Sequence, residues 1–329
     1  MELDVVFLGT SASAPTAQRS ASALLIRRGG DRVLVDCGEG TQRQLLRSDI
    51  GLVDLEQVYL THLHADHFLG LPGMLKTFEL RGREAPLTLH GPRGTRELFT
   101  TLRRIFGRVG YPIEIDELEP GDRISYDGYT VTAVRTDHAV ESLGFALVEH
   151  ERPGVFDAEE ATRLGVPHGP ERGRLQHGED VTLPDGTHVT SAQLVGEPRR
   201  GRHLVVSGDT RPCAGIVEAA TGADLLVHEA TFLADERDRA VDTRHSTAGE
   251  AALVGREAGV ALLALTHLSA RYGGGAAEEE AREVFADTVV PRDYDVITIP
   301  FPERGRPELI RRGARAGASG STDIAPSAV

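Results

Sequence analysis

The sequence predicts an α/β fold, and three observations support this prediction. Short apolar runs that predict buried strands alternate along most of the chain with amphipathic stretches that predict helices. The 329 residues are 40% apolar and 26% charged, an ordinary globular composition for one large domain or two smaller ones. Histidine and aspartate side chains follow several of the apolar runs directly. We therefore expect a sheet-based core with a polar site at the ends of its strands.

Strands and helices alternate through the first half of the chain. A short apolar run bounded by turn residues predicts each strand, and apolar residues spaced three and four apart predict each helix. Thr41 is a candidate N-cap for the first helix. The predicted strands span residues 3–8, 23–26, 32–35, 58–60, 87–90, 113–118, 130–135 and 143–148, and the predicted helices span 41–47, 72–80 and 94–106.

Residues 150–202 differ in composition from the rest of the chain. Gly, Pro, Arg and acidic residues dominate there, and few apolar residues are available for burial. We interpret this stretch as an insertion. The alternation then resumes, with strands predicted at 204–206, 224–227, 261–265 and 296–299 and helices at 247–258 and 276–287. From residue 313 onward, Ala, Gly, Ser and Pro predict a disordered tail.

Residues 59–70 carry the strongest signal of chemistry. Three histidines and one aspartate occupy six positions after a predicted strand end. Side chains two apart on an extended chain point to the same side, so His62 and His64 would face one point in space. Asp66 and His67 follow on the turn and would face a second point. Imidazole and carboxylate together suit zinc, iron or manganese, so this stretch predicts a metal site rather than a polar surface loop.

Three further polar residues follow predicted strands and are candidates for the remaining ligands. His138, Asp209 and His267 come one to four positions after apolar runs. One such residue alone is usually a cap or a turn residue. The three together, added to the four polar residues in 59–70, predict a two-metal centre.

Composition limits the class of protein. No run of 18 apolar residues exists, so no membrane-spanning helix is predicted, and the acidic start of the chain does not fit a signal peptide. Cys37 and Cys213 are the only cysteines, which indicates no disulfide framework and favours a reducing cytoplasm. The net charge of −14 argues against a surface that binds nucleic acid indiscriminately, although it is compatible with a local basic patch.

The motifs resemble the metallo-β-lactamase superfamily and, within it, the ribonuclease Z family of transfer-RNA 3′-processing endonucleases. His62-Leu63-His64-Ala65-Asp66-His67 is specific for the superfamily but not for the activity, and the resemblance extends over roughly residues 3–303. The motifs that narrow it to ribonuclease Z are Asp36-Cys37-Gly38-Glu39-Gly40-Thr41-Gln42, Thr136-Asp137-His138, Ser207-Gly208-Asp209-Thr210, His228-Glu229-Ala230-Thr231, His245-Ser246-Thr247 and Thr266-His267-Leu268-Ser269-Ala270-Arg271-Tyr272.

The resemblance implies a metallo-β-lactamase αββα sandwich, in which two packed mixed β-sheets are flanked by helices, with an inserted protruding arm. The catalytic domain would span residues 1–312, interrupted by a flexible substrate-binding arm at 150–202, and a disordered tail would span 313–329. In the family this arm grips the transfer-RNA elbow. The alternative is a mobile loop that covers the active site.

The resemblance also implies two Zn²⁺ ions per subunit, with Mn²⁺ or another divalent metal as alternatives. Two cations about 3.5–4 Å apart can activate a water between them and hold the phosphoryl oxygens of a substrate. The first ion would be held by His62, His64, His138 and Asp209, and the second by Asp66, His67, His267 and the same Asp209 as a bridge.

Catalytic roles follow from the same resemblance. Asp66 would orient the attacking hydroxide and accept its proton, the alternative being ligation only. His245 would protonate the departing oxygen. Glu229 would hold the tautomer of His245 and raise its pKa by its charge. The alternative for this pair is a helix-cap histidine beside a structural acid.

Three side chains are candidates for substrate contacts. Ser269 and Arg271 follow a metal ligand and could contact the scissile phosphate, although Arg271 could equally pair with nearby acids. Arg19 lies in a loop where family members that reject CCA-ended transfer RNA carry Pro-x-Lys-x-Arg-Asn. This chain has Ala17 and Ser20 in place of that lysine and asparagine, so rejection of a CCA end is open.

The expected function is a zinc-dependent endoribonuclease that cuts precursor transfer RNA 3′ of the discriminator nucleotide. It would leave a 3′-hydroxyl on the transfer RNA and a 5′-phosphate on the trailer. By the same resemblance the enzyme would be a homodimer in the cytoplasm, with precursor transfer RNA as its partner and no membrane association. The alternatives are a hydrolase of small phosphodiesters or thioesters and, in another class, a metal-stabilised RNA-binding protein without turnover.

Overall fold

The apolar runs pair into two β-sheets of eight and seven strands in the computed structural model, which describes residues 1–48, 50–52 and 55–311. In the first sheet the strands β1 to β3 are antiparallel neighbours, and β3 to β6 run parallel. In pairing order this sheet holds β17 (Glu308–Ile310), β16 (Val296–Thr298), β1 (Leu3–Gly9), β2 (Ala23–Arg28), β3 (Asp31–Val35), β4 (Gln57–Tyr59), β5 (Leu87–Gly91) and β6 (Ile113–Glu117).

The second sheet contains four parallel strands in a row, β12 to β15. Because parallel strands end at the same edge of a sheet, residues that follow β12, β13 and β14 are brought together there. In pairing order this sheet holds β15 (Thr288–Val289), β14 (Leu262–Thr266), β13 (Leu225–Glu229), β12 (His203–Val206), β9 (Leu143–Glu149), β8 (Tyr129–Arg135) and β7 (Arg123–Tyr126).

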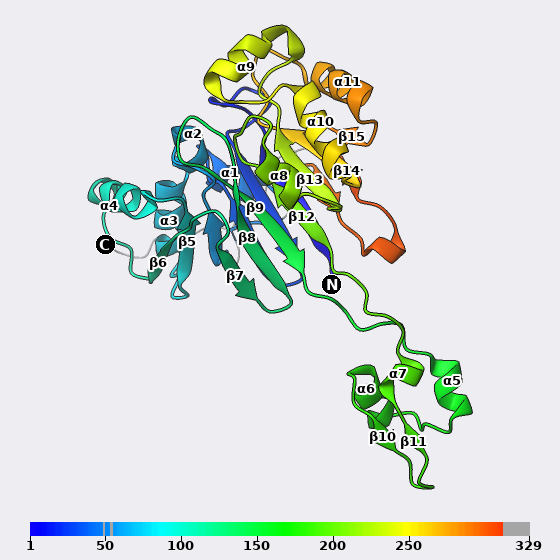
Figure 1. Cartoon of the computed structure of the whole chain (residues 1–329). Helices are drawn as coiled ribbons and strands as arrows, with labels where there is room; N and C mark the ends of the chain where they lie inside the picture. Colours follow the sequence, from blue (N-terminus) through cyan, green and yellow to red (C-terminus); the bar gives the residue numbers. More distant parts are fainter. Residues whose placement is uncertain (49, 53–54, 312–329) are drawn as a thin grey trace. The chain divides into compact units, whose positions relative to one another are not determined.

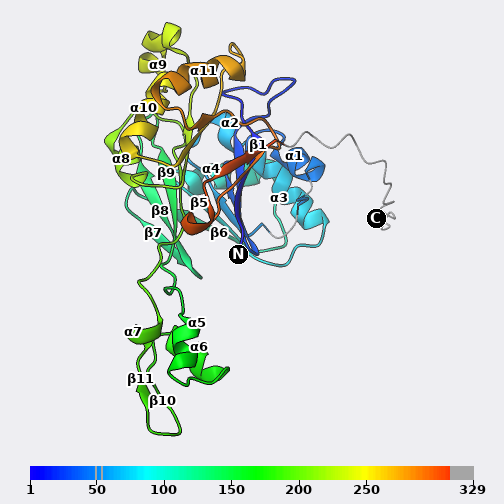
Figure 2. The same cartoon turned by 90° about the vertical axis from the view of Figure 1, so that its right-hand side faces the viewer.

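Helices cover the outer face of each sheet (Figures 1 and 2). One apolar cluster joins the first sheet to its helices through side chains such as Leu34, Met74 and Phe99, and a second joins the other sheet to Ile216 and Ala252. The helices on the first sheet are α1 (Thr41–Arg47), α3 (Leu71–Leu80) and α4 (Thr95–Phe106), and those on the second are α8 (Ala214–Ala219), α10 (Ala248–Ala258) and α11 (Gly274–Val284). The remaining helical segments outside 150–202 are α2 (Ala65–Phe68), α9 (Arg237–Thr243) and 3₁₀ turns at Ala234–Glu236 and Pro302–Arg304.

The two sheets pack against each other between these helix layers. Tyr59 of β4 meets Phe145 of β9 edge to face, with ring centroids 4.9 Å apart. The order helix, sheet, sheet, helix confirms the predicted αββα sandwich. No helix among the described residues is long and apolar enough to cross a membrane. The tail predicted at 313–329 lies outside the described residues.

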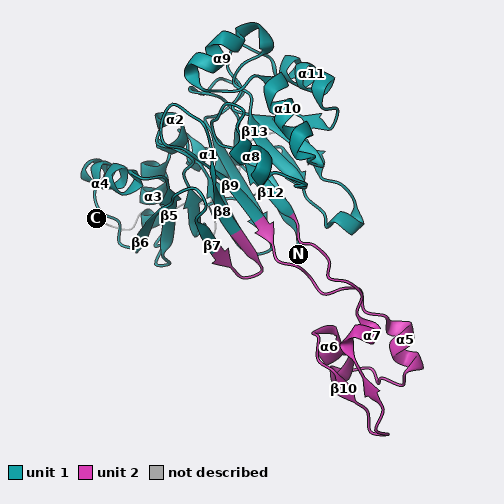
Figure 3. Cartoon of the chain, viewed as in Figure 1, with its two compact units in different colours: residues 1–124, 131–147, 203–329 teal, residues 125–130, 148–202 magenta. Residues whose placement is uncertain are grey.

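Residues 125–130 and 148–202 form a compact unit, called unit 2, and the residues before, between and after them form unit 1 (Figure 3). Unit 2 has an apolar core of its own, which includes Val166, Leu175 and Val189. The expectation of few buried apolar residues there was wrong, because these residues occur singly and give no run that periodicity detects. Its elements are α5 (Ala158–Arg163), α6 (Pro170–Gln176), α7 (Ser191–Leu194) and the hairpin of β10 (Val181–Thr182) and β11 (His188–Val189).

A buried ion pair joins the two ends of this insertion. The Arg202 guanidinium donates to both carboxylate oxygens of Glu149, with Nε–Oε2 and Nη2–Oε1 distances of 2.7 Å. Arg202 is 1% exposed, so this arginine is not available to a partner molecule. A bidentate pair with this geometry fixes where the chain leaves and re-enters the sheet.

Two predicted details of the helices were wrong. The N-cap of α1 is Gly40, whose φ of +85° favours glycine, while Thr41 is the first helical residue and donates its hydroxyl to the Gly38 carbonyl. The helix predicted to reach residue 287 ends at Val284. It ends early because the chain must extend at Thr288 to pair with β14.

Candidate metal centre and active site

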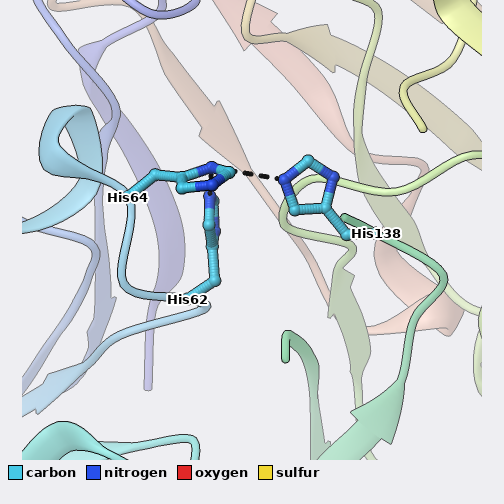
Figure 4. Close-up of side chains that lie close together, drawn as sticks. All are labelled: His62, His64 and His138. Carbon is cyan, nitrogen blue, oxygen red and sulfur yellow. Dashed lines mark hydrogen bonds between the residues drawn. The ribbon is translucent and has the colours of Figure 1, made fainter. Parts of the chain in front are cut away.

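A first group of ligand atoms forms where β4 ends. His62 and His64 follow that strand on the same side of the chain, as predicted, and His138 approaches from beyond β8 (Figure 4). His62 Nε2 lies 3.0 Å from His64 Nδ1, and His138 Nε2 lies 3.3 Å from the same atom. His62 and His138 are buried and His64 is partly exposed, so the three imidazole nitrogens converge in a space that is open to solvent on the His64 side.

A second group forms beside it from α2 and from the ends of β12 and β14. The distances that join His67 Nε2 and His267 Nε2 to Asp66 Oδ2 and Asp209 Oδ2 are 3.3–3.5 Å. The two imidazole nitrogens are 3.4 Å apart. Asp66 and His67, which we expected on an irregular turn, lie in the one-turn helix α2. The structure thus brings together the predicted ligands of the second ion.

The second group has the spacing of a tetrahedral divalent site. Ligand atoms about 2.0–2.1 Å from zinc in a tetrahedron are about 3.3–3.4 Å from one another, and the distances in the second group lie within about 0.1 Å of that value. Asp209 Oδ2 is also 3.6 Å from His62 Nε2. This carboxylate therefore lies between the groups and can serve both, which a single imidazole nitrogen cannot.

Outer hydrogen bonds fix the orientation of the ligating rings. His67 Nδ1 lies 2.7 Å from Asp36 Oδ2, and His267 Nδ1 lies 2.9 Å from Thr231 Oγ1. His138 Nδ1 donates to the Arg244 carbonyl at 3.1 Å. In each ring one nitrogen is held and the other faces the site, which is the usual arrangement of metal-binding histidines.

These orienting residues were missed in the sequence, although two of them carry a signal. Asp36 follows β3 as the predicted ligands follow their strands, and Thr231 lies two residues after Glu229. The backbone shows the site as well, because Asp36, Arg244 and His267 have φ of +61°, +57° and +55°. Non-glycine residues in this region are strained and concentrate at functional sites.

Carboxylates and imidazoles in the site shift one another's pKa in opposite directions. Burial raises the pKa of Asp209, but the neighbouring charges of His267, His67 and His62 lower it well below its usual value. Burial lowers the pKa of His67, whereas Asp209 and Asp36 on either side raise it well above normal. The potential that holds a proton on His67 is the potential that attracts a divalent cation.

Asp66 differs from Asp209 in its access to solvent. Its side chain is 14% exposed against 4% for Asp209. Asp66 Oδ2 accepts a hydrogen bond from the Ser13 backbone N–H at 2.9 Å, so the loop after β1 helps to place it. Burial raises the pKa of Asp66, but the hydrogen bond and charge of His267 and the charge of His67 lower it overall. It is therefore an ionised carboxylate at the open side of the site.

Glu229, at the end of β13, is buried and fully hydrogen-bonded. Its Oε1 accepts from His245 Nδ1 at 2.7 Å and from the Thr210 N–H at 2.8 Å. Its Oε2 accepts from the Thr231 hydroxyl and from the N–H groups of Thr231 and Ser246. Burial raises the pKa of Glu229, but the adjacent His245 lowers it below its usual value. These bonds hold a buried carboxylate in its charged form.

His245 lies beside the ligand rings with an exposed edge. Its ring stacks on that of His267 at 5.6 Å and meets the ring of His138 at 4.9 Å, and its side chain is 13% exposed. Burial lowers its pKa, but the charge and hydrogen bond of Glu229 outweigh burial and raise the pKa to about 9. A protonated imidazole is thus held next to the two groups of ligand atoms, where it can donate a proton.

The three side chains predicted to contact substrate bind to other parts of the protein. Arg271 forms an ion pair with Glu236 at 3.5 Å, and Ser269 Oγ accepts from the Arg271 N–H at 3.4 Å. Arg19 Nη1 donates to Thr10 Oγ1 and to the Pro291 carbonyl at 2.6 and 2.9 Å. Arg19 therefore anchors its loop to the body of unit 1, and a contact of any of the three with substrate stays a prediction.

Known proteins resemble this chain over nearly its whole length. The ribonuclease Z of Myxococcus xanthus is 48% identical over 305 residues, which cover 92% of this chain and 99% of that protein. The ribonuclease Z of Haloferax volcanii is 47% identical over 309 residues, covering 92% and 97%. A family model described as anti-Pycsar protein Apyc1 matches residues 3–158.

Solved structures share the fold. The short form of human tRNase Z superposes with a TM-score of 0.67 at 28% identity, covering 90% of this chain and 99% of that chain. The metallo-beta-lactamase fold protein YhfI of Bacillus subtilis gives a TM-score of 0.66 at 21% identity, covering 91% and 100%. The second likeness concerns the fold alone.

Proposed function

The chain belongs to the ribonuclease Z family, and on that premise we propose that it removes the 3′ trailer from precursor transfer RNA. Hydrolysis 3′ of the discriminator nucleotide would leave a 3′-hydroxyl on the transfer RNA and a 5′-phosphate on the trailer. The observation that carries the proposal is the position of the Glu229–His245 pair beside Asp209, whose Oδ2 is 3.3–3.6 Å from imidazole nitrogens of both ligand groups. This arrangement offers both metal ligation and a proton donor for a leaving oxygen.

Two divalent ions, which we propose are zinc, fit the two ligand groups. His62, His64 and His138 with Asp209 would hold one, and Asp66, His67 and His267 with the same Asp209 would hold the other. Such ions lower the pKa of water and stabilise negative charge on phosphoryl oxygens. Mn²⁺ suits the same imidazole and carboxylate donors.

Asp66 is proposed to orient the attacking water and to accept its proton. Its carboxylate is ionised and more accessible than that of Asp209, and the Ser13 N–H holds Oδ2 in place. One oxygen is thereby fixed while the carboxylate stays open to solvent. A base in this position must lie within hydrogen-bond reach of the water it deprotonates.

His245 is proposed to donate the proton that the departing 3′ oxygen takes up. The ribose oxygen of a trailer junction is a poor leaving group unless it is protonated as the bond breaks. Glu229 fixes Nδ1 of His245 at 2.7 Å, so Nε2 is the atom left to face the leaving group. The four other hydrogen bonds on Glu229 keep this partner immobile.

A competition between substrates tests the proposal. Purified protein with Zn²⁺ is given trailer-bearing precursor transfer RNA, a chromogenic phosphodiester and a thioester. We expect kcat/KM for the precursor to exceed that for either small substrate by at least about 10³-fold, because remote binding energy is used only by the large substrate. Preference for a small substrate would support the alternative hydrolase, and binding of RNA without turnover would support the non-catalytic alternative.

Unit 2 is proposed to be the arm that binds transfer RNA away from the cut. Its tip arginines do not form a free basic cluster, since Arg163 pairs with Glu160, Arg174 with Glu179 and Arg172 with the Val166 carbonyl. The proposal therefore rests on the family and on the independent core of the unit, which gives a small module with its own rigid surface.

Excision of residues 155–195 is expected to raise KM for precursor transfer RNA by about 100-fold, since a second binding site on one molecule adds affinity of that order. Gly154 and Gly196 are close enough to be joined, because a Cβ on Gly154 would lie 1.9 Å from the Gly196 carbonyl oxygen. The Arg202–Glu149 pair stays in place. The measurement is kcat and KM on precursor and on the chromogenic diester. Equal loss on both substrates would show that unit 2 is structural.

The double variant A17K/S20N is expected to reduce cleavage or binding of CCA-ended transfer RNA by about tenfold, since it restores one charged and one amide contact. Ala17 is exposed, and the Ser20 N–H is held by Asp293 Oδ2 at 2.7 Å, so the loop backbone should keep its place. The measurement compares inhibition by CCA-ended and CCA-less transfer RNA. The control A17M/S20N adds side-chain size without charge. If CCA-ended transfer RNA inhibits A17K/S20N as strongly as it inhibits wild type, this loop does not determine rejection of a CCA end.

A homodimer in the cytoplasm is also proposed. The family is typically dimeric, with the arm of one subunit serving the site of the other, and both cysteines of this chain are free thiols, as a reducing compartment requires. Light scattering on the purified protein would give the mass.

A further inference from the structure

The stretch 81–108 is strongly basic in a chain whose net charge is −14. It holds seven arginines against two glutamates. Many arginines elsewhere in unit 1 have acidic partners, such as Arg27 with Asp4 and Arg306 with Asp287. Five exposed arginine side chains of this stretch form no hydrogen bond or ion pair with another residue of 1–48, 50–52 or 55–311, and these are Arg81, Arg93, Arg103, Arg104 and Arg108.

Helix α4 gathers three arginines on one side. Its apolar side, with Phe99 and Phe106, packs on the first sheet. At 100° per residue, Arg96, Arg103 and Arg104 fall within about 100° of one another, beside the apolar side, and Arg103 is about 40° from Phe99. Arg93 precedes the helix and lines, with Arg96 and Arg104, a surface hollow of about 520 Å³. We call Arg93, Arg96, Arg103 and Arg104 the α4 basic face.

The hollow is not uniformly positive. Glu97 and Glu117 also line it. Glu117 Oε1, however, accepts hydrogen bonds from the backbone N–H groups of Gly94 and Arg96 at 2.8 and 3.1 Å. This glutamate therefore caps the start of α4, and neither it nor Glu97 forms an ion pair with an arginine of the α4 basic face among the residues that the structure describes.

The α4 basic face begins at the loop that carries His62 and His64, where it meets Leu63, a side chain packed on the core of the first sheet. A Cβ placed on Gly94, the N-cap of α4, would lie 3.3 Å from Leu63 Cδ1. Leu63 stands between the ligands His62 and His64, so the start of the helix contacts the ligand loop directly. Figure 1 shows α4 beside α3, and the two helices are in contact.

We propose that the α4 basic face binds backbone phosphates of the precursor RNA next to the scissile phosphate. This proposal rests on the proposed function and adds a second RNA-binding surface on unit 1. Guanidinium groups match phosphate geometry, and exposed arginines without acidic partners lose no ion pair when phosphate binds. From Arg96 to Arg104 the helix rises about 12 Å, long enough to follow more than one phosphate.

A polyanion fits this face better than a second copy of the chain. Subunit interfaces of homodimers are more apolar than the rest of the surface and have few charged residues at their centres. On α4, Ile105 is an exposed large apolar side chain, at 81% exposed, but at 100° per residue it lies about 100° or more around the helix from Arg96, Arg103 and Arg104. The face is therefore charged where a subunit contact would be apolar.

The variant R93Q/R103Q/R104Q tests the proposal. These side chains are exposed and have no partner in the described part of the chain, so the fold should not change. Arg96 is left intact because its guanidinium donates to the Ile115 carbonyl. We expect KM for precursor transfer RNA to rise about tenfold or more. We also expect the slope of log(kcat/KM) against log[salt] to become shallower by about 2, since each lost phosphate contact removes about 0.7–0.9. Hydrolysis of a chromogenic diester should be unchanged.

The control R123Q/R256Q/R304Q removes the same charge from exposed positions elsewhere in unit 1. It should keep the wild-type KM and salt slope. Equal effects in both triple variants would show a general charge effect and overturn the proposal. A change of oligomeric mass in R93Q/R103Q/R104Q alone would show a subunit contact and also overturn it. If wild type cleaves precursor and R93Q/R103Q/R104Q has the same KM and salt slope, the α4 basic face does not bind RNA, while the proposed function stands. If wild type does not cleave precursor, the proposed function itself is wrong.

Discussion

Asp209→Ala is expected to lower precursor cleavage by at least about 10⁴-fold, the order of loss when a group essential to the chemistry is removed. Asp209 Oδ2 is 3.3–3.6 Å from the nearest nitrogens of His62, His67 and His267. Its removal takes one carboxylate from both ligand groups at once. The metal content should therefore fall from two ions per chain to fewer than one, measured by elemental analysis after gel filtration.

His64→Ala is the matched variant, because His64 belongs to the first group only. It should also lose activity but retain more metal than Asp209→Ala. Thermal unfolding with and without a chelator provides a second readout, since bound metal stabilises the folded state. A chelator should lower the melting temperature of wild type and leave that of Asp209→Ala unchanged. Two ions retained with normal turnover in Asp209→Ala would contradict the shared bridge.

His245→Ala is expected to lower kcat for precursor transfer RNA by about 10²–10⁴-fold, which is the usual contribution of a proton donor. It should lower kcat for a nitrophenyl diester by much less, because nitrophenolate leaves without a proton. Metal content should stay at the wild-type value, since His245 lies beside the ligand groups and is not one of the proposed ligands. Equal loss on both substrates together with lost metal would mean that His245 holds the site together.

Glu229→Gln tests the same pair through pH. The Glu229 charge raises the pKa of His245 to about 9 against the opposing effect of burial. An acid catalyst is active below its pKa, so the activity of wild type falls as pH rises through that value. Without the carboxylate charge the pKa is lower, and the fall should begin at lower pH in Glu229→Gln. Both proteins are compared in the metal-loaded form, so that the cations act alike on the histidine. If the activities of both proteins fall over the same alkaline pH range, Glu229 does not raise the pKa of His245.

The convergence of the candidate ligands could be predicted because they follow strand ends, which lie together in the two packed sheets: β4 belongs to the first sheet, and β12 and β14 are parallel strands of the second. His62 after β4, Asp209 after β12 and His267 after β14 are examples of this rule. The Glu229–His245 contact was predicted from a family resemblance, because no local sequence pattern joins two residues that are distant in the chain. The structure adds the reason for the contact, in that β13 and the start of α10 bring them to 2.7 Å.

What could not be predicted depends on long-range contacts or on single residues. Asp36 orients His67 across 31 positions of the chain, and the Arg244 carbonyl orients His138 across 106. A main-chain carbonyl has no signature in a sequence. The core of unit 2 was missed because Val166, Leu175 and Val189 are isolated among polar residues and meet only on folding. The arginines of the α4 basic face can be seen in the sequence as a basic stretch. The contact of this helix with the ligand loop through Gly94 cannot be seen there.

Mapping the ends of the cleavage products at nucleotide resolution tests the central claim most directly. Labelled precursor transfer RNA is incubated with metal-loaded protein, and both fragments are analysed for their terminal groups. The proposed mechanism, in which Asp66 positions the water and His245 supplies the proton, predicts one cut 3′ of the discriminator. The products are a 3′-hydroxyl on the transfer RNA and a 5′-phosphate on the trailer. A 2′,3′-cyclic phosphate, or stepwise shortening from the 3′ end, would contradict it.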